Sequence, residues 1–323
     1  KTALTRPAIV KAIRNYCDKE GFVEVETPIL SPIPSGASAR PFVTHHNALD
    51  CDFYLRIATE LSLKKCMIGG IDRVYEIGRI FRNEGIDNRH NPEFTTIELY
   101  QAYGDLSDMR HWAEGLFHEI ADHVIGKEEY NWNGNVINLH KPFKWISMAE
   151  AILEKTGIDF REDIPFDKAV ELAKEHHVAL EPSWNSTGYI MQAFFDEFVE
   201  SSLIEPTFIH TYPIEISPLT KKSKDPRFVE RFELFVGGVE FANAYSELNN
   251  PFDQKSRFEA QLAARKRGDE EAADIDFSFL DAQDYGMPPA GGIGVGIDRL
   301  CMLFTEQSTI REVLLFPTMK PSK

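Results

Sequence analysis

Cysteines and long apolar runs are both scarce in this sequence. Its 323 residues include four cysteines, scattered without the C-x-x-C spacing of a metal-binding or redox motif. Zinc-binding and disulfide-stabilised proteins are therefore poor matches, and a reducing, cytoplasmic location is predicted. No apolar stretch approaches the ~20 residues that a membrane-spanning helix needs. Residues 1–17 also lack the long apolar core of a signal peptide, so no association with a membrane is expected.

An excess of basic residues is missing as well. Lys and Arg number 35 against 51 Asp and Glu, which gives a net charge of −16 at pH 7. Nucleic-acid-binding domains usually carry a basic patch or a basic excess, so any contact with nucleic acid has to be local or aided by another domain. The hydrophobic content of 43% and the charged content of 27% are ordinary for a globular enzyme. The length suffices for one large domain or two ordinary ones.

The stretch with the most chemistry per residue is FRNEGIDNRHNPEFTTIELY, Phe81 to Tyr100. Alternating apolar and polar residues predict a strand over Arg73–Glu84, and a high content of Thr, Ile, Tyr and Phe predicts a second over Phe94–Tyr103. The loop between them is rich in Gly, Asp, Asn and Pro, which favour turns. Side chains along a strand repeat every two residues, so Arg82 and Glu84 are expected on one face.

The same periodicity places Phe94, Glu98 and Tyr100 together on one face of the second predicted strand. Cationic, carboxylate, aromatic and hydroxyl groups on one surface suit the binding of a zwitterion or a nucleotide. Arg89 and His90 in the loop add positive charge of the kind that a polyphosphate needs. A charged hairpin exposed to water is the alternative interpretation.

A second hairpin is predicted over Phe228–Glu247, where two strands flank a Gly-Gly pair. If Val236 pairs with Val239, Glu233 and Glu240 lie diagonally on one face, about 7–8 Å apart. A hydrated Mg²⁺ could bridge two carboxylates at this separation, and Mg²⁺ favours such carboxylates together with substrate phosphates. Two solvated glutamates on an outer face are the alternative.

Three polar residues follow in the second strand of this hairpin. Asn243, Tyr245 and Glu247 recur with a period of two. In an ideal strand Glu247 would turn to the face opposite Glu240. Either a bulge intervenes, or the two carboxylates serve different sides of a pocket.

Glycines are concentrated in YGMPPAGGIGVGIDRLCMLF, Tyr285 to Phe304. They allow the backbone to approach a ligand closely. A helix is predicted to start at Asp298, with Arg299 in its first turn, and a helix N-terminus with an arginine suits a phosphate group. The G-x-G-x-x-G spacing of dinucleotide-binding proteins is not met.

The remaining helices and strands are predicted from periodicity and from end signals, with Thr5 and Thr59 as N-caps of the first two helices. From Lys127 to Pro206 the pattern indicates helix and loop, and an apolar turn is expected within Asp274–Tyr285. The predicted helices are Thr5–Glu20, Leu61–Ile68, Ser107–Ile125, Ser147–Thr156, Phe166–His176, Ser186–Leu203 and a charged, solvated helix over Pro251–Asp269; further strands are Phe22–Val25, Cys51–Ile57 and Phe208–Pro213.

Three segments resemble the motifs of the class II aminoacyl-tRNA synthetases. The helix, strand and proline ending in GFVEVETPIL, Gly21 to Leu30, resemble motif 1. Phe81 to Tyr100 resembles motif 2 in its lysyl-tRNA synthetase form, and the G-x-G-x-D-R ending at Arg299 resembles motif 3. GASARPF, Gly36 to Phe42, resembles a further lysyl-enzyme segment. The resemblance extends over about residues 5–319.

This resemblance implies an α+β fold, an antiparallel β-sheet flanked by helices. It implies a catalytic domain over residues 1–323 with a mainly helical insertion at about 127–206, without the N-terminal anticodon-binding OB-fold, and a homodimer formed through motif 1. The implied reaction is ATP-dependent activation of L-lysine to lysyl-adenylate and transfer to the acceptor end of tRNA(Lys).

Other functions remain open. A paralog that lysylates elongation factor P usually has Ala at the position of Gly294, so Gly294 and the Gly36–Phe42 segment favour the α-lysine enzyme. A non-catalytic, synthetase-like regulatory module would be expected to have lost motif residues. Aspartyl or asparaginyl specificity would need a basic group in the pocket rather than glutamates.

The resemblance also implies roles for individual residues. Arg82 and Arg299 are the expected catalytic residues. The expected lysine-binding residues are Gly36, Glu60, Glu98, Tyr100, Asn243, Tyr245, Glu247 and Gly294. The expected ATP-binding residues are Arg82, Glu84, His90, Asn91, Phe94, Glu240 and Arg299. Mg²⁺ is the expected metal, held by Glu233 and Glu240.

Overall fold

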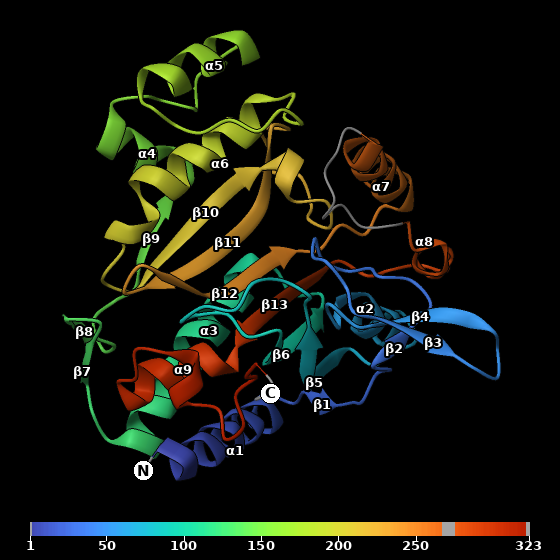
Figure 1. Cartoon of the computed structure of the whole chain (residues 1–323), viewed down its shortest axis with the longest axis vertical. Coiled ribbons are helices and arrows are strands. Elements are labelled where there is room, and N and C mark those ends of the chain that lie inside the picture. Colours follow the sequence, from blue (N-terminus) through green and yellow to red (C-terminus); the bar gives the residue numbers. More distant parts are fainter. Residues whose placement is uncertain (1, 267–274, 321–323) are drawn as a thin grey trace.

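The computed structural model describes residues 2–266 and 275–320 of the chain (Figure 1). Three predictions extend beyond this part of the chain. They are the end of the helix predicted to reach Asp269, the start of the Asp274–Tyr285 segment, and the two ends of the predicted 1–323 domain. No helix within it is long and apolar enough to cross a membrane.

One large sheet organises the described part of the chain, with eight strands in the order β1-β5-β6-β13-β12-β11-β10-β9. Neighbouring strands are antiparallel except at the two edges, where β1 pairs with β5 and β9 with β10 in parallel. The predicted α+β architecture with a mainly antiparallel sheet is confirmed. The strands are β1 (Val23–Glu24), β5 (Arg73–Phe81), β6 (Glu93–Ala102), β9 (Lys144–Ser147), β10 (Thr207–Pro213), β11 (Phe228–Val236), β12 (Val239–Ser246) and β13 (Ala290–Gly296).

One face of the sheet is covered by α1 (Thr2–Lys19), α3 (Leu106–Ile120) and α9 (Ile297–Thr305). A π-helical turn over Ala121–Ile125 continues α3. Alternate residues of the central strands, such as Leu99, are buried against these helices in the main apolar core. Because strand side chains alternate, the intervening polar residues are left on the opposite face.

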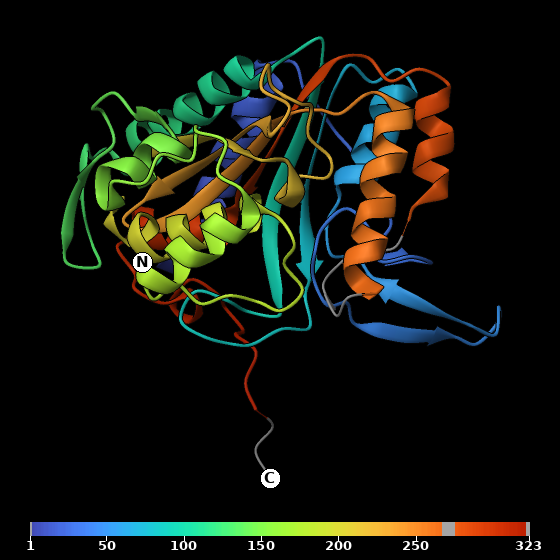
Figure 2. The ribbon, with the colours of Figure 1, turned by 90° about the horizontal axis from the view of Figure 1, so that it is seen from above.

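That opposite face is bordered by α2 (Glu60–Ile68), α7 (Pro251–Lys266) and α8 (Phe277–Asp284). Figure 2 shows α7 and α8 side by side, near the small sheet of β2 (Leu30–Ser31), β3 (Val43–His46) and β4 (Cys51–Leu55). The apolar turn expected before Tyr285 is thus a helix, whose N-cap Asp276 accepts a hydrogen bond from the backbone N–H of Phe279.

The segment over residues 127–206 begins with strands, so the expected helix and loop pattern is wrong for its first part. The hairpin of β7 (Glu129–Trp132) and β8 (Asn135–Asn138) is built into the main core through Tyr130 and Trp132, and β9 joins the large sheet. The helices are α4 (Met148–Thr156), α5 (Phe166–Glu175) and α6 (Thr187–Phe198). They form a second core over β10 and β11 at one end of the sheet (Figure 1).

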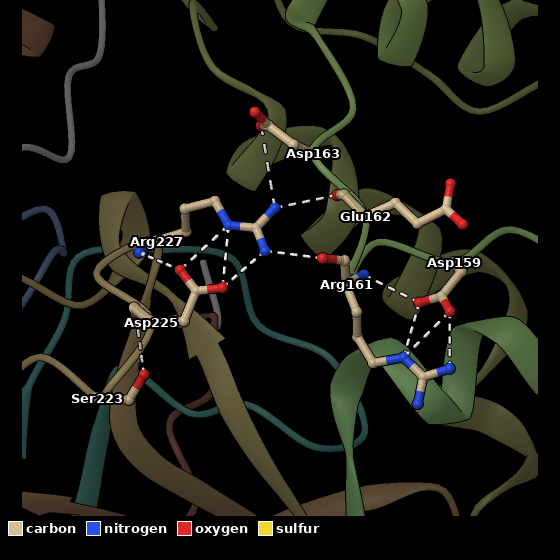
Figure 3. A network of polar contacts seen from close by, with 7 residues as sticks. All are labelled: Asp159, Arg161, Glu162, Asp163, Ser223, Asp225 and Arg227. Atoms are coloured by element: carbon tan, nitrogen blue, oxygen red, sulfur yellow. Dashed lines mark hydrogen bonds and ion pairs between the residues drawn. The ribbon is translucent and has the colours of Figure 1, made fainter.

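A partly exposed arginine connects this helical segment to a loop that precedes β11. Arg227 binds Asp225 side by side and donates hydrogen bonds to the backbone carbonyls of Arg161 (2.7 Å) and Glu162 (3.0 Å), as Figure 3 shows. The same loop continues back to residues 216–220, beside the polar face of the sheet. The network therefore fixes the position of the insertion relative to that loop.

Three local predictions are wrong. Thr5 does not begin α1, which already starts at Thr2. Thr59 has the N-cap position of α2, but within the described structure its side chain makes no capping hydrogen bond. β5 ends at Phe81, so Arg82 and Glu84 lie beyond the strand; the next partner would be a proline, which has no N–H to donate.

The solvated face expected for α7 is also wrong in part. Gln254 and Arg257 are buried, and they donate to the carbonyls of Pro218 (3.1 Å) and Ser217 (3.4 Å). Short 3₁₀ turns over Glu200–Ser202, Ile214–Ile216 and Ile310–Glu312 complete the described elements.

Replacing Arg56 by Met tests how much the buried ion pair between Arg56 and Glu76 stabilises the fold. Arg56 and Glu76 form a buried ion pair at 2.6 Å, and Glu76 also accepts a hydrogen bond from Thr27. Removing the arginine leaves a buried carboxylate without its cation, so the free energy of unfolding should fall by about 3–5 kcal/mol. Urea unfolding measures this change.

Arg14→Met is the matched control, because Arg14 pairs with Glu24 at 3.0 Å on the surface. Its loss should change the free energy of unfolding by about 1 kcal/mol or less. Equal effects of the two substitutions would contradict the role assigned to the buried pair.

Candidate functional site

A cavity of about 540 Å³ opens on the polar face of the sheet, bounded by α2, α7 and the loop of residues 216–220. This volume suits a small-molecule site. All but one of the predicted site residues line it: Gly36, Glu60, Arg82, Glu84, His90, Asn91, Phe94, Glu98, Tyr100, Glu233, Glu240, Asn243, Tyr245, Gly294 and Arg299. The exception among the described residues is Glu247.

One row of paired residues crosses the sheet beneath the cavity. Glu233 of β11 pairs with Asn243 of β12. Asn243 pairs in turn with Gly294 of β13, and Gly294 pairs with Glu98 of β6. Paired residues project to the same face. Gly294 has no side chain, so the row has a carboxylate at each end and an open space between them.

A second row runs parallel to the first. Arg231 pairs with Tyr245, Tyr245 with Gly292, and Gly292 with Tyr100. Arg231 was not predicted, although its period-two spacing from Glu233 in the same strand was a usable signal. It donates a hydrogen bond to Glu233 at 2.5 Å, so the buried carboxylate has a fixed orientation.

The predicted register of the second hairpin is confirmed, and β12 contains a bulge. Phe235 pairs with Glu240, whereas Leu234 pairs with Ala242, which leaves Phe241 as an extra residue. Of the two alternatives for this strand, the bulge is correct. It shifts the side-chain alternation by one residue, so the polar residues before and after it share the cavity face.

The end of the cavity near α2 is acidic. Glu98 accepts hydrogen bonds from the Thr59 backbone N–H (3.3 Å) and the Tyr100 hydroxyl (3.2 Å). Burial raises the pKa of Glu98 to about 7, and repulsion from the Glu60 carboxylate adds to the shift. A cation bound here would favour the ionised carboxylate.

Glu247 is fully enclosed and is not among the residues that line the cavity. Its side chain is fully buried and forms an ion pair with Lys64 at 2.5 Å. A Cβ atom on Gly292 would overlap Glu247 Oε1 and the Tyr100 ring, so both groups fill the space over this glycine on the cavity side of the sheet. Burial raises the pKa of Glu247 to about 8, while the Lys64 ammonium opposes the shift.

Lys64 was not predicted as part of the site. It forms a second ion pair, also at 2.5 Å, with Glu60 one helical turn earlier. The spacing of four residues was a signal in the sequence, because such residues are neighbours on a helix. Only the fold brings in Glu247, which is distant in the chain.

The opposite end of the cavity is basic. Arg299 donates to the Glu240 backbone carbonyl at 2.6 Å, and its Nη2 lies 3.3 Å from His90 Nε2. The guanidinium of Arg82 lies over the Phe94 ring, 5.3 Å from its centroid. These groups bring positive charge and an aromatic face from segments far apart in the chain.

Glu233 and Glu240 lie close enough to influence one another. Burial raises the pKa of Glu233 to about 7; Arg231 opposes this shift and Glu240 adds to it. A divalent cation would relieve this repulsion, so the donor set fits Mg²⁺. Among residues 2–266 and 275–320 no three His, Cys, Asp or Glu side chains could hold a metal ion, so a bound phosphate would have to complete the ligands.

The helical insertion contributes to a smaller hollow of about 300 Å³ beside the basic end. Gln192, Phe195 and Glu200 line it together with Arg89 and Arg299. The sequence of the insertion had shown no catalytic-looking cluster. Its contribution depends on the packing of α6 against the sheet, which no local pattern encodes.

The chain belongs to a family of tRNA synthetases: the family model described as tRNA synthetases class II (D, K and N) matches residues 1–320. Lysine--tRNA ligase of Streptococcus thermophilus is 55% identical over 318 residues, and lysine--tRNA ligase of Streptococcus agalactiae is 54% identical over the same length. Each alignment covers 98% of this chain and 64% of the relative, so the chain spans a little under two thirds of the length of these relatives.

Replacing Glu98 by Gln tests its buried state. Its pKa is raised from 4.5 to about 7, so the folded protein binds a proton that the unfolded chain releases. Stability from this group is present below about pH 4.5 and is lost as the pH rises to about 7. In the wild type this group should lower the free energy of unfolding by about 3 kcal/mol as the pH rises, and E98Q should abolish that decrease. Urea unfolding at pH 5 and pH 8 measures it.

The control is Glu154→Gln, an exposed glutamate on α4. It removes the same charge and should leave the pH dependence of unfolding as in the wild type. If E98Q and E154Q give the same slope, the raised pKa of Glu98 is wrong.

Proposed function

We propose that this chain is the catalytic part of a lysine--tRNA ligase. It would activate L-lysine with ATP, giving lysyl-adenylate and pyrophosphate, and then transfer the lysyl group to tRNA(Lys). The observation that carries the proposal is the division of one cavity into an acidic end, formed by Glu60 and Glu98, and a basic end containing Arg299. The similarity to lysine--tRNA ligases over 98% of the chain supports it.

The acidic end suits an amino acid with two ammonium groups. Glu60 would take the α-ammonium group, and Gly36 would lie against the bound amino acid. Glu98, Tyr100 and Glu247 would surround the ε-ammonium group. A buried ammonium needs paired charge, which explains several carboxylates in one small volume. Tyr245, Asn243 and Gly294 would line the path of the aliphatic chain. All of these proposed lysine-binding residues except Glu247 line the cavity, which supports the placement.

The basic end suits a nucleotide triphosphate. Phe94 would stack on the adenine and Glu84 would meet its edge. Arg82 would contact the lysine carboxylate and the α-phosphate, while His90 and Arg299 would hold the outer phosphates. Asn91 is buried, and its side-chain amide donates to the Glu93 carbonyl at 2.6 Å, which supports a role in shaping the loop around ATP.

Magnesium would be held by Glu233 and Glu240 together with phosphate oxygens. When bound, it supplies neutralisation of the phosphate charge. Arg231 and Tyr212 hydrogen-bond the Glu233 carboxylate at 2.5 and 2.9 Å and would keep it oriented toward such an ion.

The chemical step needs no general base. The lysine α-carboxylate is already a nucleophile; one of its oxygens attacks the α-phosphorus, and the bond to the pyrophosphate oxygen breaks. Catalysis then consists of holding the two reactants in line and stabilising charge at phosphorus. Arg82 and Arg299 carry positive charge on the reactant and leaving-group sides.

The remaining properties follow from the same proposal. The described residues would form one catalytic domain, with residues 127–206 as its insertion, in a cytoplasmic enzyme. A homodimer is proposed through the motif 1 segment, where β1 is a two-residue edge strand and Val23, Ile29 and Leu30 are exposed. Unpaired strand edges with apolar side chains favour association.

The direct test is exchange of labelled pyrophosphate into ATP in the presence of Mg²⁺. Label should enter ATP with L-lysine, and at least about 100-fold more slowly with aspartate or asparagine, whose carboxylate or amide cannot pair with buried glutamates. Absence of exchange with L-lysine would refute the proposal. Faster exchange with β-lysine than with L-lysine would favour the enzyme that lysylates elongation factor P.

A pair of glycine substitutions tests the floor of the cavity. A Cβ at Gly292 would overlap the Tyr100 ring and the Glu247 carboxylate, whereas a Cβ at Gly294 would stand at an ordinary 3.5 Å from Glu98 Cγ. Gly292→Ala should raise the KM for lysine by about 10-fold or more. Gly294→Ala should raise it less, and the KM for ATP should change little in both. A larger effect of Gly294→Ala would contradict this geometry.

A further inference from the structure

Lys64 is a fully buried lysine that the proposed reaction does not use. It projects from α2 with no exposed side-chain surface, between the carboxylates of Glu60 and Glu247, and its ammonium contacts each at 2.5 Å. The rings of Tyr100 and Phe279 lie 5.7 and 5.9 Å from its Nζ. A flexible, strongly hydrated side chain is rarely enclosed in this way without paired charge.

Each of the two carboxylates uses one oxygen for Lys64. Glu60 contacts it through Oε1, and Glu60 also lines the cavity. Glu247 contacts it through Oε2, while Glu247 Oε1 has no hydrogen-bond partner among the described residues and lies against Gly292 of the cavity wall. The Lys64 ammonium thus bridges two carboxylates, one proposed to bind the α-ammonium group of lysine and the other its ε-ammonium group.

The charges in this region balance only when Lys64 is counted. When all three are ionised, Glu60, Glu98 and Glu247 provide three negative charges, and the Lys64 ammonium offsets one of them. The two remaining negative charges match the two ammonium groups of a lysine substrate. A buried charge left over would carry a large desolvation penalty.

We propose that Lys64 is a positioning and specificity-determining residue that bridges the carboxylates receiving the α- and ε-ammonium groups and sets both their separation and their net charge. This inference rests on the proposed lysine activation. Lys64 touches neither substrate nor reacting atoms. It acts through Glu60 and Glu247, by holding the two carboxylates at a fixed separation and by favouring the ionised form of Glu247.

The pH dependence follows from the groups that face Lys64. These are Glu60 on its own helix, Glu247 directly after β12 and the Tyr100 ring from β6; Glu98 of β6 and Tyr245 of β12 act in turn on Glu60 and Glu247. Without the ammonium, nothing opposes the increase in the pKa of Glu247 that burial causes. Binding of lysine would then require the loss of a proton at a higher pH than in the wild type.

The test compares Lys64→Met with Lys65→Met in lysine-dependent pyrophosphate exchange from pH 6 to pH 9. Lys65 is the next residue of the helix, partly exposed, and pairs with Asp276 at 3.5 Å. At pH 7, K64M should raise the KM for lysine by about 30-fold or more. The acidic limb of kcat/KM for lysine should move to higher pH, and the KM for ATP should stay within about twofold. K65M should match the wild type.

A purely structural role predicts a different pattern. Loss of folding would lower the activity equally at all pH values and would affect ATP and lysine alike. An unshifted acidic limb in folded K64M, or the same shift in K65M, would overturn the proposal. Thermal unfolding and the KM for ATP establish that the variant is folded.

Lys64→Arg provides a second test, which does not require the protein to fold with a neutral side chain at position 64. It keeps the charge, so the acidic limb should stay in place, but its planar fork should change the separation of the two carboxylates. Discrimination between lysine and ornithine, one methylene shorter, should weaken several-fold; unchanged discrimination would contradict the proposal. If the wild type shows no lysine-dependent exchange, the proposed function itself is refuted. If the wild type is active and K64M has the same KM for lysine and the same pH profile, this inference alone is refuted.

Discussion

Carboxylates buried on one face of an antiparallel sheet impose the strongest constraint on this structure. Glu247 is removed from water and Glu98 is partly buried at the cavity surface, and burial raises the pKa of each. Such groups are costly unless cations or hydrogen-bond donors face them. Lys64 supplies a cation from α2, and Thr59 and Tyr100 supply donors. The position of α2 against the sheet is therefore tied to the charge balance of the cavity floor as well as to apolar packing.

The opposite polarity of the two ends of the cavity follows from the order of strands. β6, β13, β12 and β11 are adjacent, so residues from segments more than a hundred positions apart form continuous rows across the sheet. Gly294 leaves the middle of the first row open, whereas the Tyr100 ring and the Glu247 carboxylate fill the space over Gly292 in the second. The bulge at Phe241 adjusts the alternation of β12, so Glu240 faces the same cavity as the residues after it. Backbone geometry thus supplies space and side chains supply charge.

Much of this arrangement could be predicted from local patterns. Period-two spacing gave the shared face of Glu98 and Tyr100, and the Gly-Gly pair gave the register of the second hairpin. The hairpin over residues 129–138 was missed because its buried aromatic residues resemble a helix or a strand equally in a short window. Arg82 and Glu84 were assigned to a strand that ends earlier, since a proline interrupts the pairing, yet both still reach the cavity.

The sequence by itself determined the class of fold, the family and most of the residues that line the cavity, because these depend on periodicity, turn chemistry and contiguous motifs. Only the tertiary structure decided that the Glu247 carboxylate lies over Gly292, that Lys64 bridges it to Glu60, and that the insertion reaches the basic end through Glu200. The physical reason is that ion pairing and burial depend on distances between elements remote in the chain. Such distances are fixed by packing, which no local pattern of residues specifies.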